Sequence, residues 1–302
     1  MNIPGFKGEI RTNEPMSRHT SYAIGGPVDI LAAPSDRDDL HLLLREIRER
    51  KLPFFVLGGG TNLLVRDGGY RGVAVSLGRM RAIKVEREYH SVGGHYAVLL
   101  AEAGASLAGL LTFAADRGLT GLEFATGIPG TVGGAVCMNA GTADGEMGDV
   151  VDAVTMLGPE GGISIIDREQ MGFGYRTASV PAGQVVVAAS LVLRQGERDQ
   201  IKERIRTLLK KRKERQPGGF PNAGSVFKNP QDESAGRLIE AAGLKSTRIG
   251  NAQVSEQHAN FIVNLGKARA SDVLQLMEIV QKTVLEKHGV PLEPEIRIIG
   301  ED

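Results

Sequence analysis

The first eighty residues combine two kinds of hydrophobic spacing, one helical and one extended. Ser35–Asp38 is typical of a helix N-cap followed by an acidic first turn. Behind it, apolar residues recur at intervals of three and four, which predicts a helix. These residues are Leu40, Leu43, Leu44 and Ile47. Apolar runs at Phe54–Leu57 and Val73–Leu77 predict two strands. The segment therefore reads as a small α/β unit, closed around a glycine-rich loop after the first strand.

From about residue 81 the pattern changes to short strands around one helix. That helix has one apolar face and is expected to end at Gly118. Its apolar face comprises Leu107, Leu110, Leu111 and Ala114. The turn Gly158–Gly162 separates two strand-like runs, 153–157 and 163–167, and the fully apolar run Val185–Leu193 predicts a further strand. The sequence thus predicts a second subdomain of α+β type that ends near residue 196.

The remaining third of the chain is dominated by predicted helices. Residues 197–215 are strongly basic, and their isoleucines and leucines recur at helical spacing, which predicts an amphipathic connecting helix. Two capped helices follow at 234–242 and 271–288, stopped by Gly243 and Gly289. We interpret this region as a separate small domain.

Composition and charge narrow the classes of partner. The chain has 302 residues, is 41% hydrophobic, and carries 36 basic and 36 acidic side chains. It is long enough for two or three domains. Because the basic and acidic side chains balance, the chain has no net positive charge that would attract nucleic acid or an anionic membrane. For the basic stretch 197–215, a solvated helix face is favoured over a nucleic-acid patch. No apolar stretch approaches the ~20 residues that a membrane span needs. With Cys137 as its one cysteine and no signal-like start, the chain is expected in the cytoplasm, and no metal site is expected.

Two glycine-rich runs carry the strongest chemical signal, Gly58–Leu64 and Gly127–Gly134. Consecutive glycines let the main chain approach a pyrophosphate and direct several N–H groups at it, which predicts two cradles for one large anionic cofactor. Neither run fits the dinucleotide fingerprint, because Leu63 stands where the third glycine of the first run would be and no helix pattern follows. For either run alone, the alternative that the glycines only form tight turns stays open.

Three further motifs carry a family resemblance: Gly172–Arg176, Asn222–Pro230 and Glu293–Arg297. With the two glycine runs, they resemble the UDP-N-acetylenolpyruvoylglucosamine reductase family, over about residues 13–300 and in the family's order. The resemblance implies an α+β fold: a two-part FAD-binding domain of the vanillyl-alcohol-oxidase type plus a small C-terminal α/β substrate-binding domain. The implied ranges are 1–80, rejoined by about 290–302, for the first FAD subdomain; 81–196 for the second; 197–216 for the connecting helix; and 217–289 for the substrate-binding domain.

The resemblance also implies the reaction and its cofactors. FAD would be bound non-covalently, in keeping with the lack of histidine in residues 57–67. NADPH would be the co-substrate, and the acceptor would be UDP-N-acetylglucosamine enolpyruvate, reduced to UDP-N-acetylmuramate for peptidoglycan. NADPH and the acceptor would use one pocket in turn, so no separate nicotinamide domain is needed. We expect a monomer.

Site residues follow from the same resemblance, position by position. Arg176 would clamp the substrate carboxylate, Ser225 would donate a proton, and Glu295 would assist at the enolate-like intermediate. The expected FAD-binding residues are Gly58, Gly59, Gly60, Thr61, Asn62, Leu63, Thr126, Gly127, Pro129, Gly130, Thr131, Gly133, Gly134, Asn139 and Gly141. The expected substrate-binding residues are Tyr175, Arg215, Lys228, Asn229 and His258.

One departure from part of the family concerns the cover of the substrate. Some members carry a long insertion with a tyrosine after the Tyr-Arg motif, whereas only residues 177–183 separate this motif from the next predicted strand. The chain resembles the shorter type, and another element must exclude water.

Two other functions stay open from the sequence. A related flavin oxidase would act on a different small molecule, with oxygen as the acceptor. A non-enzymatic nucleotide-binding protein would use the glycine loops without redox chemistry.

Overall fold

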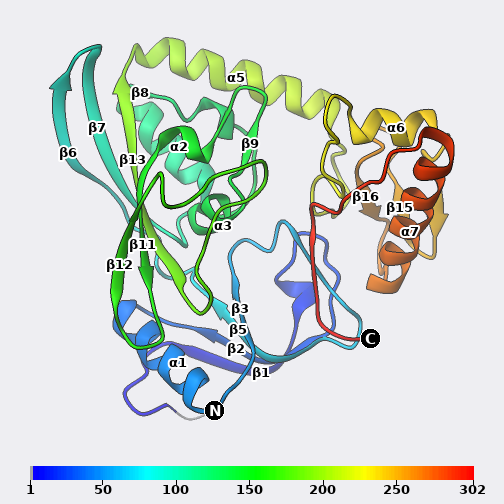
Figure 1. The fold of residues 1–302 in the computed structure, drawn as a ribbon, viewed down its shortest axis with the longest axis horizontal. Coiled ribbons are helices and arrows are strands. Elements are labelled where there is room, and N and C mark those ends of the chain that lie inside the picture. Colours follow the sequence, from blue (N-terminus) through cyan, green and yellow to red (C-terminus); the bar gives the residue numbers. More distant parts are fainter. Residues whose placement is uncertain (1–2) are drawn as a thin grey trace. The chain divides into compact units, whose positions relative to one another are not determined.

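The computed structural model describes residues 3–302 (Figure 1). By packing, they form two compact units. Unit 1 comprises the described residues up to Arg11 together with Ile30–Gly59 and Val73–Lys211, and unit 2 comprises Thr12–Asp29, Gly60–Gly72 and Arg212–Asp302. These units cut across the predicted domain ranges, because strands β1 (Glu9–Pro15), β2 (Pro27–Ala33) and β5 (Tyr70–Ser76) each contribute residues to both. The predicted ranges therefore stay a prediction.

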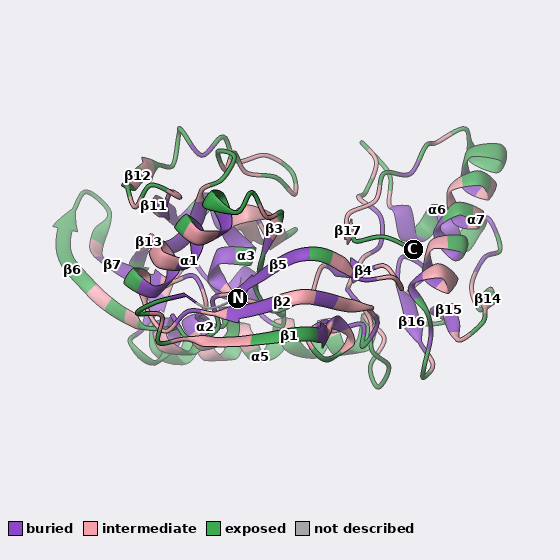
Figure 2. Ribbon diagram, turned by 90° about the horizontal axis from the view of Figure 1, so that it is seen from below, coloured by how far each residue is buried: buried purple, intermediate pink, exposed green. Residues whose placement is uncertain are grey.

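A six-stranded antiparallel sheet forms the centre of unit 1 (Figure 1). Its main path runs β12-β11-β13-β7-β6, and β8 pairs with the end of β13. The strands are β6 (Ile83–Ser91), β7 (Gly94–Glu102), β8 (Leu119–Thr120), β11 (Val151–Leu157), β12 (Ile163–Asp167) and β13 (Val185–Gln195). The predicted strands at 153–157, 163–167 and 185–193 are confirmed. Strand β6 forms one edge and is exposed along most of its length (Figure 2).

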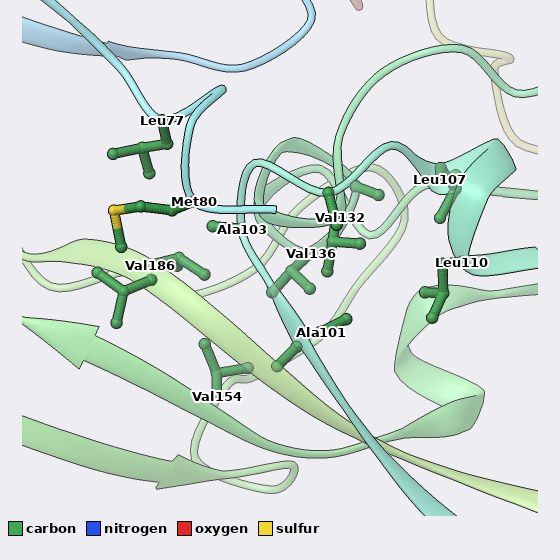
Figure 3. Packing of buried hydrophobic residues seen from close by; sticks show 14 of the residues in the cluster. Leu77, Met80, Ala101, Ala103, Leu107, Leu110, Val132, Val136, Val154 and Val186 are labelled. Carbon is green, nitrogen blue, oxygen red and sulfur yellow. The ribbon is translucent and has the colours of Figure 1, made fainter. Parts of the chain in front are cut away.

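Helices complete the core of unit 1. Helix α2 (Leu107–Asp116) shows the predicted apolar face and ends before Gly118, whose φ of +69° suits glycine. The other short helices are η2 (Glu123–Ala125), α3 (Val132–Cys137) and α4 (Met147–Val150). Side chains of α2 and α3 gather with those of β7, β11 and β13 in one buried cluster (Figure 3). This packing explains why β13 is apolar on successive positions, since both of its faces are covered.

The predicted α/β unit of the first eighty residues is also present. Strand β3 (Phe54–Leu57) pairs in parallel with β5 in a sheet of order β1-β2-β5-β3. Helix α1 (Arg37–Glu49) begins after Asp36, whose carboxylate accepts the Asp39 N–H at 2.9 Å. A 3₁₀ turn, η1 (Met16–Arg18), lies between β1 and β2.

Unit 2 contains the small domain and the end of the chain. A three-stranded antiparallel sheet and two helices share one buried cluster. These elements are β14 (Arg248–Ile249), β15 (Ala252–Val254), β16 (Ile262–Asn264), α6 (Ala235–Ala241) and α7 (Ala270–His288). Strand β17 (Arg297–Ile299) pairs in parallel with β4 (Leu63–Val65), which confirms that the C-terminal strand returns to the first eighty residues. Two two-residue strands, β9 (Gly141–Thr142) and β10 (Gly145–Glu146), form a separate hairpin within unit 1.

Helix α5 (Arg198–Arg215) is confirmed, but its predicted apolar face is covered only in part. Along this fully described helix, Ile201 is the buried residue, whereas Leu209 remains 37% exposed. Arg198 and Lys202 form ion pairs with Asp116 at 3.2 and 2.7 Å, so the first turns are held partly by charge. Ile205 and Leu208 are half-buried, and Ile205 packs against the core of unit 1, so the apolar face loses its cover only toward Leu209.

A carboxylate from a distant loop fixes the start of α7. Asp67 accepts the N–H groups of Ala270 and Ser271 at 2.8 and 3.0 Å, so the helix begins one residue before the predicted Ser271. Burial raises the pKa of Asp67, but these backbone donors and the nearby Arg269 outweigh it, and the pKa lies below its ordinary value. The ionised carboxylate therefore stabilises the folded state.

Replacing Asp67 with alanine should lower the free energy of unfolding by about 1–2 kcal/mol at neutral pH. Because the folded-state pKa is depressed, this stabilisation is fully present above the unfolded pKa of about 3.9 and is lost as pH falls through the folded value. Urea unfolding at several pH values checks this, with Asp38→Ala, an exposed aspartate of α1, as the control. Equal stability losses at neutral pH and well below the folded pKa of Asp67 would contradict the charge argument.

Tyr22 carries an unsatisfied buried hydroxyl. Its side chain is 0% exposed, and the hydroxyl makes no hydrogen bond to any residue in the described range 3–302. Burial raises the pKa of this phenol. An unpaired buried hydroxyl costs about 1–3 kcal/mol, so Tyr22→Phe should raise the free energy of unfolding by about 1 kcal/mol. Chemical denaturation of both proteins measures this; a destabilised variant would mean that the hydroxyl has a partner such as an internal water.

Candidate functional site

The start of the first glycine-rich run lies beside the second run within unit 1. A Cβ atom at Gly58 would lie 2.6 Å from Oγ1 of Thr131, so only glycine permits this approach. Thr131 is the N-cap of α3 and accepts the Gly134 N–H at 3.4 Å. This proximity agrees with the prediction that the two runs serve one cofactor.

Several backbone amides of these runs are available to an anion. In the hydrogen bonding of the described residues, the N–H groups of Gly58, Gly59, Gly127, Gly130 and Thr131 have no intramolecular acceptor. By contrast, Val132 and Gly133 donate to the carbonyls of Ala105 and Ala103 at 2.8 and 2.9 Å. A cluster of unused N–H groups on glycine loops suits a pyrophosphate, so these residues fit the anionic part of a dinucleotide cofactor.

Other members of the predicted cofactor set have local structural roles. Gly133 lets α3 approach the end of β7, since its Cβ would lie 2.8 Å from that of Ala103. Thr126 is buried, and its hydroxyl donates to the carbonyl of Glu123 at 2.7 Å. Gly60 belongs to unit 2, where its φ is +62° and a Cβ would lie 2.0 Å from the His19 carbonyl oxygen. These residues shape the loops.

Asn62 connects the first glycine run to the C-terminal segment of unit 2. Its side-chain amide donates to the carbonyl of Glu295 at 3.0 Å, and its own carbonyl accepts the Arg297 N–H at 2.9 Å. Leu63, the next residue of the run, is buried in β4. This asparagine therefore anchors the backbone of a predicted catalytic residue.

Unit 2 brings Ser225 and Glu295 together. Residues 226–228 and 293–296 run antiparallel, with a bridge between Phe227 and Pro294. The carbonyl of Val226 accepts the Glu295 N–H at 2.8 Å, so Ser225 and Glu295 stand on adjacent segments. Buried Asn260 also holds this region in place. Its Oδ1 accepts the Phe227 N–H at 3.0 Å, and its Nδ2 donates to the Phe227 carbonyl at 2.8 Å. Nothing in the sequence pattern had singled out Asn260, since no periodicity marks a buried asparagine that bonds to the backbone.

Three predicted substrate contacts in unit 2 already have partners. The ammonium of Lys228 pairs with Glu293 at 2.6 Å, and Asn229 accepts the Ala235 N–H at the start of α6 at 3.1 Å. Nδ1 of His258 accepts the Asn260 N–H at 3.3 Å, and the ring packs edge-on against a neighbouring phenylalanine. Burial lowers the pKa of His258, which favours the neutral ring. Arg215, the fourth, is exposed at the last residue of α5.

Arg176 belongs to unit 1 and lies on a tight turn. Gly174 and Thr177 exchange backbone hydrogen bonds at 3.0 and 3.1 Å, which leaves Tyr175 and Arg176 at the tip. Arg176 has a φ of +57°, and its Nη2 donates to the carbonyl of Gly141 at 3.0 Å. Its guanidinium carbon lies 5.0 Å from the centre of the Tyr175 ring, and Tyr175 is 48% exposed. A left-handed backbone at a non-glycine residue is uncommon and is often associated with function.

Two kinds of feature are absent from the described residues. Within 3–302, no three or more histidine, cysteine, aspartate or glutamate side chains gather as a metal site would require. Likewise, the helices of this range lack the combination of length and hydropathy that crossing a membrane requires.

Comparisons with known proteins agree on one family. Residues 216–299 match the family model of the UDP-N-acetylenolpyruvoylglucosamine reductase C-terminal domain, and residues 28–167 match that of the FAD binding domain. Proteins named UDP-N-acetylenolpyruvoylglucosamine reductase are similar over nearly the whole chain. That of Caldanaerobacter subterraneus is 48% identical over 98% of this chain and 95% of its own, and that of Geotalea uraniireducens is 45% identical over 99% and 97%. The crystal structure of the Thermus caldophilus enzyme of this name matches with a TM-score of 0.80 at 37% identity, covering 97% of this chain and 99% of that one.

Proposed function

Because this chain belongs to the UDP-N-acetylenolpyruvoylglucosamine reductase family, we propose that it reduces UDP-N-acetylglucosamine enolpyruvate to UDP-N-acetylmuramate, with FAD as cofactor and NADPH as electron donor. The observation that carries the proposal is 48% identity to a reductase of this name over 98% of the chain. The product is a peptidoglycan precursor, so the enzyme acts in cell-wall synthesis. Its fold is α+β, with an FAD-binding region and a separate C-terminal domain.

The fit of the glycine loops supports the cofactor assignment. The amides of Gly58, Gly59, Gly127, Gly130 and Thr131 would hold the pyrophosphate of FAD. When bound, FAD supplies the transfer of a hydride from NADPH to the terminal carbon of the enolpyruvyl double bond. The protein must then manage the charge and the proton on the substrate.

Ser225 is proposed to donate the proton. Hydride addition at the terminal carbon leaves an electron pair on the adjacent carbon, delocalised into the substrate carboxylate. Proton transfer from the Ser225 hydroxyl to that carbon completes the lactyl ether, and the alkoxide is then reprotonated. A hydroxyl is a weak acid, so this role depends on a fixed position, which the antiparallel segment beside Glu295 supplies.

Arg176 is proposed to stabilise the charge that develops on the carboxylate, and Glu295 is proposed to assist as a hydrogen-bond donor in its protonated form, because an ionised carboxylate would repel that charge. A guanidinium offers two parallel N–H donors to a carboxylate and stays charged at any working pH. The Arg176 guanidinium is oriented by the Gly141 carbonyl, and the Glu295 backbone is held by Asn62 and Val226. Both side chains therefore start from restrained backbones, as electrostatic preorganisation requires.

The substrate-binding proposals divide by exposure. Tyr175 and Arg215 are exposed, and we assign both to contacts with the UDP moiety. Lys228, Asn229 and His258 bond within unit 2, so we assign their contribution chiefly to the shape of that region. The proposal also includes a cytoplasmic, monomeric enzyme of the shorter type.

An anaerobic two-step reaction tests the function. The purified protein is reduced with NADPH and mixed with UDP-N-acetylglucosamine enolpyruvate, while the flavin absorbance and the product are followed. Prompt reoxidation with formation of UDP-N-acetylmuramate would establish the reaction. A flavin that stays reduced until oxygen is admitted would favour an oxidase, and a protein without a flavin band would favour a non-enzymatic nucleotide binder.

A further inference from the structure

Asn139, in the loop that follows α3, is entirely enclosed by protein. Its side chain is 0% exposed, and its φ is +41°. Nδ2 donates to the carbonyl of Gly174 at 2.9 Å, and Oδ1 accepts the N–H of Gly148 at 2.8 Å. Both ends of the amide are thus committed to the backbone of unit 1. This arrangement differs from that of a residue whose side chain contacts a cofactor.

The acceptor of this bond is the first residue of the turn that carries Arg176. The Gly174 carbonyl receives the Thr177 N–H, which closes the turn, and the Asn139 amide, which fixes the turn to the loop after α3. A second link runs the opposite way, from Nη2 of Arg176 to the Gly141 carbonyl. Residues 139–141 and 174–176 are therefore joined at both ends.

The turn needs such support because its conformation is unfavourable. Arg176 has a φ of +57°, where the Cβ atom of an L-residue crowds the backbone. A strained residue persists only when its surroundings over-determine it. The two links from 139–141 supply this constraint within unit 1.

We propose that Asn139 is a positioning residue for Arg176: it holds the Gly174–Thr177 turn so that the guanidinium is aimed before substrate binds. This inference rests on the proposed function, since it assumes that Arg176 acts on the substrate. Without the Asn139 donor, the turn relaxes, the guanidinium loses its fixed direction, and the developing carboxylate charge loses an aligned partner. Misplacement of a reacting group by about 1 Å can cost about 10²-fold in rate.

The test variant is Asn139→Asp, which keeps an acceptor for Gly148 but turns a carboxylate oxygen toward the Gly174 carbonyl. We expect reoxidation of the reduced flavin by the substrate to slow by about 10–100-fold, with flavin content and reduction by NADPH close to wild type. In an Arg176→Lys background, the same change should slow the reaction by no more than about threefold, because the group it positions is already gone. Hydrogen exchange at the Thr177 amide, measured without cofactor, should speed up.

Asn264→Asp is the matched control. Asn264 is also a buried asparagine, 2% exposed, that donates to the Tyr22 carbonyl at 2.9 Å and accepts the Gly266 N–H at 2.8 Å, but in unit 2. This variant should lose thermal stability and leave Thr177 exchange and the reoxidation rate within about twofold of wild type. If Asn139→Asp does not fold, Asn139→Ser removes the donor without adding charge and is measured in the same way.

The outcomes separate this inference from the proposed function. Full activity of both Arg176→Lys and Arg176→Asn would overturn the role of Arg176 itself. A slow Arg176→Lys combined with a multiplicative effect of the Asn139 variant would overturn the positioning role alone. Loss of flavin with unchanged Thr177 exchange would instead make Asn139 a cofactor contact, as the sequence predicted, and would also overturn the inference.

Discussion

Replacing Ser225 with alanine should slow the reoxidation of reduced flavin by UDP-N-acetylglucosamine enolpyruvate by about 10²–10⁴-fold. The variant cannot protonate the carbon next to the carboxylate, and a proton from water lacks the fixed position of the hydroxyl. The backbone N–H groups of Val226 and Lys228 hold this segment in place by donating hydrogen bonds to neighbouring carbonyls. Loss of the Ser225 hydroxyl removes none of these bonds, so the fold should be unchanged. Stopped-flow measurement of each half-reaction checks this, because reduction by NADPH requires no proton from Ser225 and should stay within about twofold of wild type.

The control for Ser225 is Ser234→Ala. Ser234 is the N-cap of α6, but its side chain makes no capping hydrogen bond. Its replacement should leave both half-reactions unchanged. A wild-type reoxidation rate in Ser225→Ala would reject the proton-donor role, whereas equal slowing of both half-reactions would point to damage of the fold or of cofactor binding.

Replacing Arg176 with lysine should lower the rate of the same half-reaction by about 10²–10³-fold. Lysine keeps the charge, but as a point donor it cannot bind the Gly141 carbonyl and still offer a planar fork to a carboxylate. The effect should fall more on the rate at saturating substrate than on KM, because the charge on the carboxylate grows in the transition state. Steady-state and single-turnover kinetics separate these quantities.

Two further variants isolate the chemical role of Arg176. Arg176→Asn should keep the melting temperature near that of wild type, since asparagine tolerates a positive φ, and should be as slow as Arg176→Lys or slower. Arg194→Lys, at an exposed arginine of β13, should change neither half-reaction. Normal turnover in Arg176→Lys would show that charge alone suffices and that the fork geometry has no part.

Local signals in the sequence predicted the elements well. The apolar stripe ending at Gly118 corresponds to α2, and the run Val185–Leu193 corresponds to β13. Both could be predicted because a helix buried on one face has apolar residues at intervals of three and four, whereas a strand buried on both faces has them at successive positions. Helix α5 shows the limit of this rule. Helical spacing predicts a helix, but whether an apolar face is covered depends on neighbours that the spacing does not specify.

The site was predictable in its residues but not in its connections. Motifs carried the resemblance that named Arg176, Ser225 and Glu295. They could not show that Asn62 and Asn139, expected to contact FAD, bond to the backbones of Glu295 and Gly174. Such bonds join distant segments through one amide each, with no periodic signature. The bridge between Phe227 and Pro294 could not be predicted either, since it involves too few residues to produce an alternating pattern in the sequence.

The pairing of β4 with β17 has a consequence for how the chain acquires activity. The bond from Asn62 to Glu295 spans 233 positions of sequence, and the strand pair beside it is equally non-local. Closing so long a loop lowers the conformational entropy of the chain before the contacts that stabilise the pair have formed. This pairing should therefore form late in refolding. The hairpins and helices of unit 1 use contacts much closer in sequence. Refolding protein should therefore regain its helical signal, and then its flavin site, before Glu295 is anchored, and catalysis should be the last property to return.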